Sequence, residues 1–346
     1  MEGETVRKDF REIDIRKKLL ITGSAGFIGF HLAKQLLELG CTVVGYDNLN
    51  DYYDVSLKRD RLEILKGYNG FQFIQGDLAD AGALSEVFLE HDPRIVVNLA
   101  AQAGVRYSIQ NPDAYMQSNM IGFFNILEEC RKSYAQGKIP VEHLVFASSS
   151  SVYGNQDKVP FSVEDKVDEP ISFYAATKKS NELMAHAYSH IYGIPATGLR
   201  FFTVYGPYGR PDMAYFSFAR KILAGEPIQV FNQGDLYRDF TYIDDIVTGI
   251  KNILNNPPIS NTTATRFKVY NIGNHQPVNL LYFIEILEDK LGVKAIKELL
   301  PMQQGDVYQT YADVCDLIKD FDFKPDTPIE AGLSKFVAWY KAYYQA

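Results

Sequence analysis

Short apolar runs alternate with amphipathic stretches through the first half of the chain, and this alternation limits the possible folds more than any other feature. A strand, a helix and a second strand in succession form a parallel βαβ unit. The pattern therefore predicts an α/β fold with a doubly wound parallel sheet of the Rossmann type. The runs expected as strands are 18–22, 42–46, 71–74, 95–99, 144–147 and 196–202, and the main expected helices are 27–39, 114–134 and 174–192.

Three glycines follow the first expected strand and open the first expected helix, in the segment 23–29, Gly-Ser-Ala-Gly-Phe-Ile-Gly. Glycine lets the backbone approach a pyrophosphate, and the helix N-terminus supplies free N–H groups with a partial positive charge. Asp47 ends the second expected strand, where a carboxylate can accept a hydrogen bond from an adenosine ribose. No Lys or Arg follows Asp47 before Lys58, which favours NAD over NADP. An ordinary turn at the glycines and a capping role for Asp47 remain the alternatives.

The ends of further strands carry residues suited to the same dinucleotide. Ligands of doubly wound sheets bind outside the carboxyl ends of the strands. An aspartate follows the third strand, and two small alanines after the fourth would let a cofactor lie against the backbone. Each residue alone could be an ordinary loop residue, but together they predict a cofactor site. The expected cofactor-binding residues at the strand ends are Gly23, Gly26, Phe27, Ile28, Gly29, Asp47, Asn48, Asp77, Leu78, Ala100 and Ala101.

A serine run and a Tyr-x-x-x-Lys motif form the candidate catalytic machinery. Ser148–Ser151 end the fifth expected strand, and Tyr174 and Lys178 stand four residues apart on one face of the next expected helix. A lysine ammonium close to a phenol favours the phenolate, so we expect Tyr174 to act as a base below its ordinary pKa. Tyr134 and Lys138 repeat the spacing, and only the serine run distinguishes the first pair from the second.

Glycine and proline crowd the chain after Tyr205, and shorter elements follow. We expect residues 17–204 to form the NAD-binding Rossmann domain, to which residues 238–275 return. Residues 205–346 are expected to form mainly a smaller substrate-binding domain of mixed α/β structure. Residues 1–16 are charged and lack the apolar core of a secretion signal, which predicts a flexible extension.

The acidic composition and the few cysteines argue against several classes of function. With a net charge of −8, the chain is not expected to bind nucleic acid by neutralising phosphates. No stretch approaches the roughly 20 apolar residues of a membrane span. Cys41, Cys130 and Cys315 show neither zinc spacing nor a disulfide framework, and the histidines are scattered. We therefore expect no metal site, and a cytoplasmic protein with reduced thiols.

These motifs together resemble the extended short-chain dehydrogenase/reductase superfamily, which comprises NAD-dependent sugar-nucleotide epimerases and dehydratases. The resemblance covers nearly the whole chain after residue 16 and rests on the segments 23–29, 148–154, 174–178 and 238–240, with Asp47 and Asp77. Within the superfamily, the chain is most similar to UDP-glucuronate 4-epimerases. That narrower similarity rests on the segments 50–55, 102–108, 200–214, 300–303 and 305–307.

The resemblance implies a reaction in which tightly held NAD is reduced and then regenerated. Tyr174, with its pKa lowered by Lys178, would remove the proton from the hydroxyl of sugar carbon 4, and the hydride of that carbon would pass to NAD. Ser149 would hydrogen-bond the same oxygen. The 4-keto sugar would then turn over while UDP stays anchored, and the hydride would return to the opposite face.

The resemblance also assigns the groups that hold the rest of the substrate and cofactor. Arg238 would bind the diphosphate, Asp306 the uridine ribose, and Asn119 would lie on the nicotinamide side. Arg106 would touch either the diphosphate or a sugar carboxylate, with a structural role as the alternative. The two long expected helices carry apolar faces that pair in homodimers of the superfamily, although packing on the sheet of one subunit would also explain them.

Ser151 separates the epimerase reaction from its sister reactions. Superfamily decarboxylases and dehydratases have a glutamate at this position, and without that carboxyl group an acid/base step at carbon 5 loses its agent. The resemblance implies that Ser150, Ser151 and Thr203 hold a uronate carboxylate, with Arg210 making a charge-assisted bond to it. A 4-epimerase of neutral UDP-hexoses, a UDP-glucuronate decarboxylase and a catalytically silent NAD-binding protein remain the alternatives.

Overall fold

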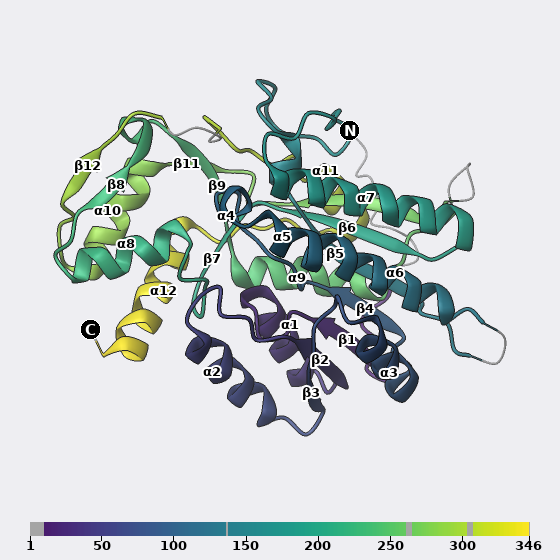
Figure 1. Cartoon of the computed structure of the whole chain (residues 1–346). Helices are drawn as coiled ribbons and strands as arrows, with labels where there is room; N and C mark the ends of the chain where they lie inside the picture. The colour runs from purple at the N-terminus through teal and green to yellow at the C-terminus, as the bar shows by residue number, and fades with distance from the viewer. Residues whose placement is uncertain (1–9, 136–137, 261–264, 303–306, 346) are drawn as a thin grey trace.

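The computed structural model describes residues 10–135, 138–260, 265–302 and 307–345, which form a large sheet flanked by helices and a smaller lobe beside it (Figure 1). The large sheet is parallel throughout, with the strand order β10-β6-β5-β4-β1-β2-β3. This order confirms the predicted Rossmann-type α/β fold. The strands are β1 (Leu19–Thr22), β2 (Val43–Asp47), β3 (Phe71–Gln75), β4 (Ile95–Asn98), β5 (His143–Ser149), β6 (Ala196–Phe201) and β10 (Phe267–Ile272).

Successive residues of the central strands face two separate apolar cores. In β1, Leu19 and Ile21 belong to one core and Leu20 to the other, and all three are fully buried. Because both faces of the sheet are covered, its strands are continuously apolar. Helices α1 (Phe27–Glu38), α2 (Val55–Lys66) and α9 (Ile243–Leu254) cover one face, and α3 (Ala81–His91), α6 (Gly122–Lys132) and α7 (Phe173–Tyr192) cover the other (Figure 1).

The expected helix 114–134 is not one regular α-helix. It begins in α5 (Pro112–Tyr115), continues through the π-helix η1 (Met116–Ile121) and ends in α6, and the short α4 (Tyr107–Gln110) precedes it. A π-helical turn inside a longer helix is frequently found at functional sites. Here it directs the amide of Asn119 toward the loop that follows β4.

The smaller lobe follows β6 and contains two small sheets. One has the strand order β11-β9-β7 and the other pairs β12 with β8. Between β9 and β11 the chain returns to the large sheet, where α9 packs on α1 and β10 forms an edge strand. The remaining elements are β7 (Thr203–Tyr205), β8 (Ile228–Val230), β9 (Tyr237–Tyr242), β11 (Pro277–Asn279), β12 (Lys297–Leu299), α8 (Ala214–Leu223), α10 (Leu280–Leu291), α11 (Cys315–Phe321) and α12 (Ile329–Tyr344), with the 3-10 helices η2 (Ser150–Tyr153) and η3 (Phe231–Gly234).

The predicted flexible extension 1–16 lies partly outside the described residues, which begin at residue 10. The described part is attached to the loop after α9. Arg11 exchanges two hydrogen bonds of 2.8 Å with Asn256, and Asn255 donates to the carbonyl of Glu12 at 2.6 Å. Among the described helices, none has the length and apolar character needed to cross a membrane.

Candidate active site

A cavity of about 470 Å³ lies at the carboxyl ends of the large sheet, with walls from both lobes. Parallel strands end at the same edge, so the residues that follow them in sequence meet there. The predicted site residues that line the cavity are Gly23, Gly26, Phe27, Ile28, Gly29, Asp47, Asn48, Asp77, Leu78, Ala100, Ala101, Arg106, Ser149, Ser150, Ser151, Tyr174, Lys178, Thr203, Arg210 and Arg238. Asn119 does not line it, and Asp306 lies outside the described residues.

The glycine segment packs so closely against neighbouring backbone that side chains would not fit there. Gly23 has a φ of +70°, and a Cβ there would lie 2.7 Å from the backbone nitrogen of Ala100. A Cβ on Gly29 would lie 2.1 Å from the carbonyl oxygen of Gly23. Gly26 caps α1 without a side-chain hydrogen bond, and the first turn of α1 has no acidic residue. The N–H groups of this helix end therefore remain available to an anion.

Asp47 ends β2 at the place where an adenosine ribose would lie in a fold of this kind. Its carboxylate accepts hydrogen bonds from the backbone nitrogens of Ala25 at 3.1 Å and Leu49 at 2.9 Å, and burial raises its pKa. Lys58 also lines this end of the cavity, and its Nζ donates to Asn50. Lys58 was not predicted as a site residue from the sequence. It lies on the first turns of α2, which bring its side chain to the cavity.

Asn48 and Asp77 come from neighbouring strand ends and meet at the cavity wall. Asn48 Nδ2 donates to Asp77 Oδ2 at 2.8 Å. Leu78 follows in the same wall, and the alanines after β4 leave the sheet edge open on the opposite side. These residues line the part of the cavity where the sequence predicts the dinucleotide.

Asn119 lies behind the cavity wall and does not line the cavity itself, and its predicted place near the nicotinamide stays a prediction. Its side chain is buried, and its amide is saturated by the protein. Its Oδ1 accepts from the backbone nitrogen of Gln102 at 2.8 Å, and its Nδ2 donates to the carbonyl of Gln102 and to Thr177 Oγ1. Asn119 therefore holds the loop after β4 against α7, and Ser118 is its neighbour that reaches the cavity.

Ser149, Tyr174 and Lys178 meet where β5 ends and α7 begins. Lys178 Nζ donates to the carbonyl of Ala147 at 2.8 Å and lies 6.0 Å from the centre of the Tyr174 ring. Ser151 donates to Ser149 Oγ at 2.9 Å.

The second Tyr-x-x-x-Lys pair lies elsewhere in the structure. Tyr134 donates to the carbonyl of Val141, and neither Tyr134 nor Lys138 lines the cavity. Tertiary structure therefore selects Tyr174 as the candidate base.

The electrostatics of Tyr174 correct one part of the sequence interpretation. Burial raises the pKa of Tyr174 above its ordinary value, while a hydrogen bond from Ser149 and the charge of Arg210 oppose that rise. Burial also lowers the pKa of Lys178, to about 8. The protein groups therefore do not by themselves bring the Tyr174 pKa below its ordinary value, and Arg210 contributes to the stabilisation that was assigned to Lys178.

The substrate end of the cavity carries the predicted arginines. Arg238 Nη1 donates to the carbonyls of Tyr237 and Tyr308 at 2.9 and 3.1 Å. The guanidinium of Arg106 lies 5.2 Å from the centre of the Phe231 ring. These contacts hold two cationic side chains in the cavity wall, Arg238 on β9 and Arg106 in the loop after β4.

A buried ion pair next to the serine run was not among the residues predicted from the sequence. Arg200 on β6 and Glu182 on α7 make two hydrogen bonds of 2.8 Å, and Ser148 donates to Glu182 at 2.7 Å. Arg200 also donates to the hydroxyl of Tyr153 at 3.0 Å. The network joins β5, β6, α7 and η2 directly beneath Ser149. The only sign of this ion pair in the sequence is that Arg200 stands within an otherwise apolar segment.

Comparison with known proteins identifies the family of this site. Residues 19–273 match the model of the NAD dependent epimerase/dehydratase family. Protein CapI of Staphylococcus aureus is 52% identical over 95% of this chain and 99% of its own length. A probable UDP-glucuronate 4-epimerase of Rhizobium meliloti is 47% identical over 95% of this chain and 98% of its own length.

A solved structure shows the same architecture. The UDP-glucuronic acid 4-epimerase of Bacillus cereus, in complex with UDP-glucuronic acid and NAD, matches with a TM-score of 0.85 and 34% identity. The match covers 94% of this chain and all of that one. With the glycine segment, Asp47 and the Ser149, Tyr174 and Lys178 constellation in one cavity, this chain belongs to the NAD dependent epimerase/dehydratase family.

Proposed function

We propose that this protein is a UDP-glucuronate 4-epimerase, which interconverts UDP-glucuronate and UDP-galacturonate through transient oxidation at carbon 4. One observation carries the proposal: Ser149, Tyr174 and Lys178 share a cavity with Arg210, and a serine stands at position 151. The similarity to proteins named as UDP-glucuronate 4-epimerases from bacteria and plants supports it.

Tyr174 is the proposed base toward the hydroxyl of carbon 4. Tyr174 and Ser149 both line the cavity, and Ser149 would hydrogen-bond the same sugar oxygen and favour the phenolate. Lys178 is held by the carbonyl of Ala147, which fixes its ammonium beside the base. Bound NAD would accept the hydride of carbon 4 and return it, and its own positive charge would further favour the phenolate.

Arg210 and the serine run are proposed to receive the uronate carboxylate. Arg210 supplies the positive charge, and Ser150, Ser151 and Thr203 supply neutral hydroxyl donors in the same wall. No carboxyl group stands at position 151 to act on carbon 5. The keto acid formed at carbon 4 is thus held by hydrogen bonds, without the acid/base group that elimination would need.

Arg238 and Arg106 are proposed to hold the diphosphate, and Asp306 remains the proposed partner of the uridine ribose. A 4-epimerase of neutral UDP-hexoses is the second candidate. It is favoured by the ion pair between Arg210 and Asp212, which already neutralises the charge that would attract a uronate.

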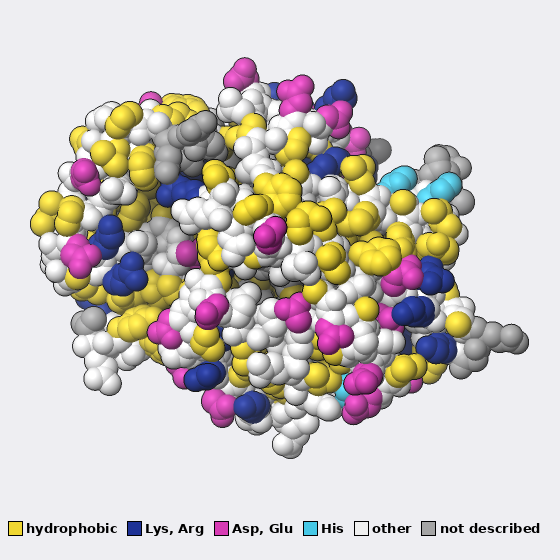
Figure 2. Space-filling view, viewed as in Figure 1, with side chains coloured by type: hydrophobic (Ala, Val, Ile, Leu, Met, Phe, Trp, Pro, Cys, Tyr) yellow, Lys and Arg dark blue, Asp and Glu magenta, His cyan; other side chains and the backbone are white. Residues whose placement is uncertain are grey.

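We also propose a cytoplasmic homodimer. Phe124 on α6 and Leu183 and Ile191 on α7 are 45, 59 and 64% exposed. Figure 2 shows apolar side chains gathered over α6 and α7 on the face toward the viewer. A second copy of the same helix pair would cover this face with a four-helix contact.

A product assay tests the proposed reaction. Purified protein is incubated with UDP-glucuronate, and the sugar nucleotides are separated by chromatography; UDP-galacturonate is the expected product. UDP-xylose as the product would replace the proposal by a decarboxylase, and turnover of UDP-glucose alone would replace it by the neutral-hexose epimerase. The Tyr174→Phe protein is the control, because it should keep NAD and lose roughly 100- to 10,000-fold in rate.

A further inference from the structure

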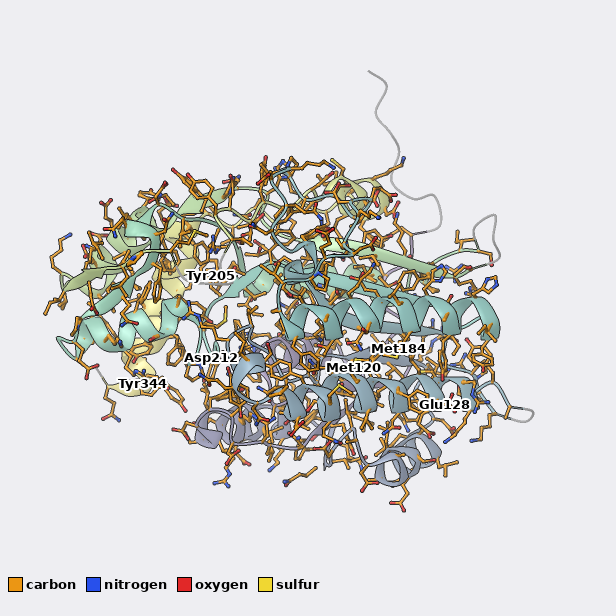
Figure 3. The ribbon with its side chains drawn as sticks, turned by 45° about the horizontal axis from the view of Figure 1, so that its top comes forward. Met120, Glu128, Met184, Tyr205, Asp212 and Tyr344 are labelled. Atoms are coloured by element: carbon orange, nitrogen blue, oxygen red, sulfur yellow. The ribbon has the colours of Figure 1, made fainter. Side chains whose placement is uncertain are left out.

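Arg210, which the proposed function assigns to the uronate carboxylate, already binds a carboxylate of the protein. Its Nε donates to Asp212 Oδ1 at 3.0 Å, and its Nη2 donates to Asp212 Oδ2 at 2.5 Å. The hydroxyl of Tyr52 donates to the same Oδ2 at 3.2 Å. Asp212 therefore lies between the two lobes (Figure 3), fixed by one residue from each.

The two members of the pair face different surroundings. Arg210 lines the cavity, whereas Asp212 does not. Because Nε and Nη2 are both directed at Asp212, Nη1 is the nitrogen of Arg210 that donates to no side chain or carbonyl in the described part of the protein. A ligand carboxylate that enters the cavity would meet this remaining edge of the guanidinium.

The loop that carries the pair is anchored to the large domain. Arg61 on α2 is fully buried, and its Nη2 donates to the carbonyls of Tyr208 at 2.6 Å and Gly209 at 3.1 Å. Since these two residues immediately precede Arg210, its backbone has little freedom to move away from Asp212. A substrate carboxylate would therefore share the guanidinium with Asp212.

We propose that Asp212 is a specificity-determining residue that weakens the hold of Arg210 on a uronate carboxylate. The inference rests on the proposed function. Two carboxylates around one guanidinium leave a net negative charge, so the second is bound less tightly than it would be by an unpaired arginine. A neutral UDP-hexose carries no carboxylate, so it does not compete with Asp212 for Arg210. The weaker hold also lets the carboxylate leave Arg210 when the 4-keto sugar turns over in the cavity.

Binding measurements with the Asp212→Asn protein test this role. Both it and its parent carry Tyr174→Phe, so that no turnover disturbs the titrations, and dissociation constants for UDP-glucuronate and UDP-glucose are measured by calorimetry with NAD bound. Asparagine keeps the shape of the side chain and removes its charge. We expect UDP-glucuronate to bind roughly three- to tenfold more tightly and UDP-glucose to change by less than about twofold.

A matched control exists elsewhere in the chain. Asp14 and Arg16 form the same bidentate contact, at 2.8 and 2.9 Å, and neither lines the cavity. Asp14→Asn removes an equal charge from a pair with the same bidentate geometry at an exposed site, and it should change neither dissociation constant. If Asp212→Asn does not retain NAD, Asp212→Ser removes the same charge with a smaller side chain.

The outcomes separate the inference from the function on which it rests. Weaker binding of UDP-glucuronate, or an equal change for both sugars, would show that Asp212 only positions Arg210 and would overturn the inference. If the parent protein binds both sugars equally well, the proposed uronate specificity is wrong and the inference falls with it. A gain for UDP-glucuronate alone, absent from Asp14→Asn, is the supporting result.

Discussion

Replacing Glu182 by glutamine should destabilise this protein far more than replacing an exposed glutamate. The side chains of Glu182 and Arg200 are each only 3% exposed, and two hydrogen bonds of 2.8 Å join them. Glutamine keeps the shape of the side chain but leaves the guanidinium buried without an opposite charge. Removing one partner of a buried pair costs about 3–5 kcal/mol.

Urea unfolding followed by circular dichroism measures this loss directly. Glu63→Gln is the control, since it breaks an exposed pair with Lys66 and should cost about 0–1 kcal/mol. The double change Glu182→Leu with Arg200→Met should recover part of the stability, because it leaves no buried guanidinium without an opposite charge. A loss below about 1 kcal/mol for Glu182→Gln would refute the reasoning, since that is the range of surface pairs.

The pair of Glu182 and Arg200 should also make the free energy of unfolding depend on pH in the acidic range. Burial disfavours the charged form of Glu182, but hydrogen bonding and the charge of Arg200 outweigh it and lower the pKa of Glu182 in the folded protein. Its contribution is complete above the pKa of the unfolded chain and is lost as the pH falls through the lower folded pKa. The unfolding free energy of Glu182→Gln should therefore fall less steeply with acid than that of the parent.

Three further changes test the cofactor loop, the base and the dimer. Gly23→Ala should abolish NAD retention, measured as the 260 nm absorbance of the purified protein, because a Cβ would clash with the backbone after β4. Gly193→Ala is the control: its φ of +72° is similar, but the space around it is open, so it should keep NAD and lose only about 1 kcal/mol of stability. Ser149→Ala removes a hydrogen bond that lowers the pKa of Tyr174, so the acidic limb of the kcat/KM profile should move to higher pH; a limb that stays in place would remove Ser149 from this role. Phe124→Glu places a charge on the exposed apolar face and should yield a monomer in light scattering if that face is the dimer contact.

The periodicity of the chain was sufficient to predict the large sheet and its cofactor edge. Strands buried on both faces leave continuous apolar runs in the sequence, and glycines that must approach a ligand stand at fixed distances from the first of them. Motif spacing and the serine run pointed to Tyr174 and Lys178, and the family resemblance assigned Ser149. The choice between Tyr174 and Tyr134 rested on the neighbouring serine run, and the cavity places only Tyr174 among the lining residues.

The orientation and pairing of polar side chains could not be predicted from hydrophobic periodicity or motif spacing. Asn119 was predicted as a cofactor-binding residue, yet it does not line the cavity, and its amide is bonded to the backbone of Gln102. Tyr52 meets Asp212 across 160 positions of chain, and no local pattern links the two. Such contacts depend on how segments that are distant in sequence pack together.

By itself, the sequence determined the α/β class, the NAD-binding edge and the identity of the candidate base, because hydrophobic period and motif spacing are local properties that survive in any packing of the chain. Only the tertiary structure decided which charges meet. It pairs Glu182 with Arg200 beneath Ser149, and it places Asp212 beside Arg210 at the edge of the cavity. Because the energy of a charge depends on its burial and on its nearest partners, the strength with which Arg210 holds a uronate is a property of the fold.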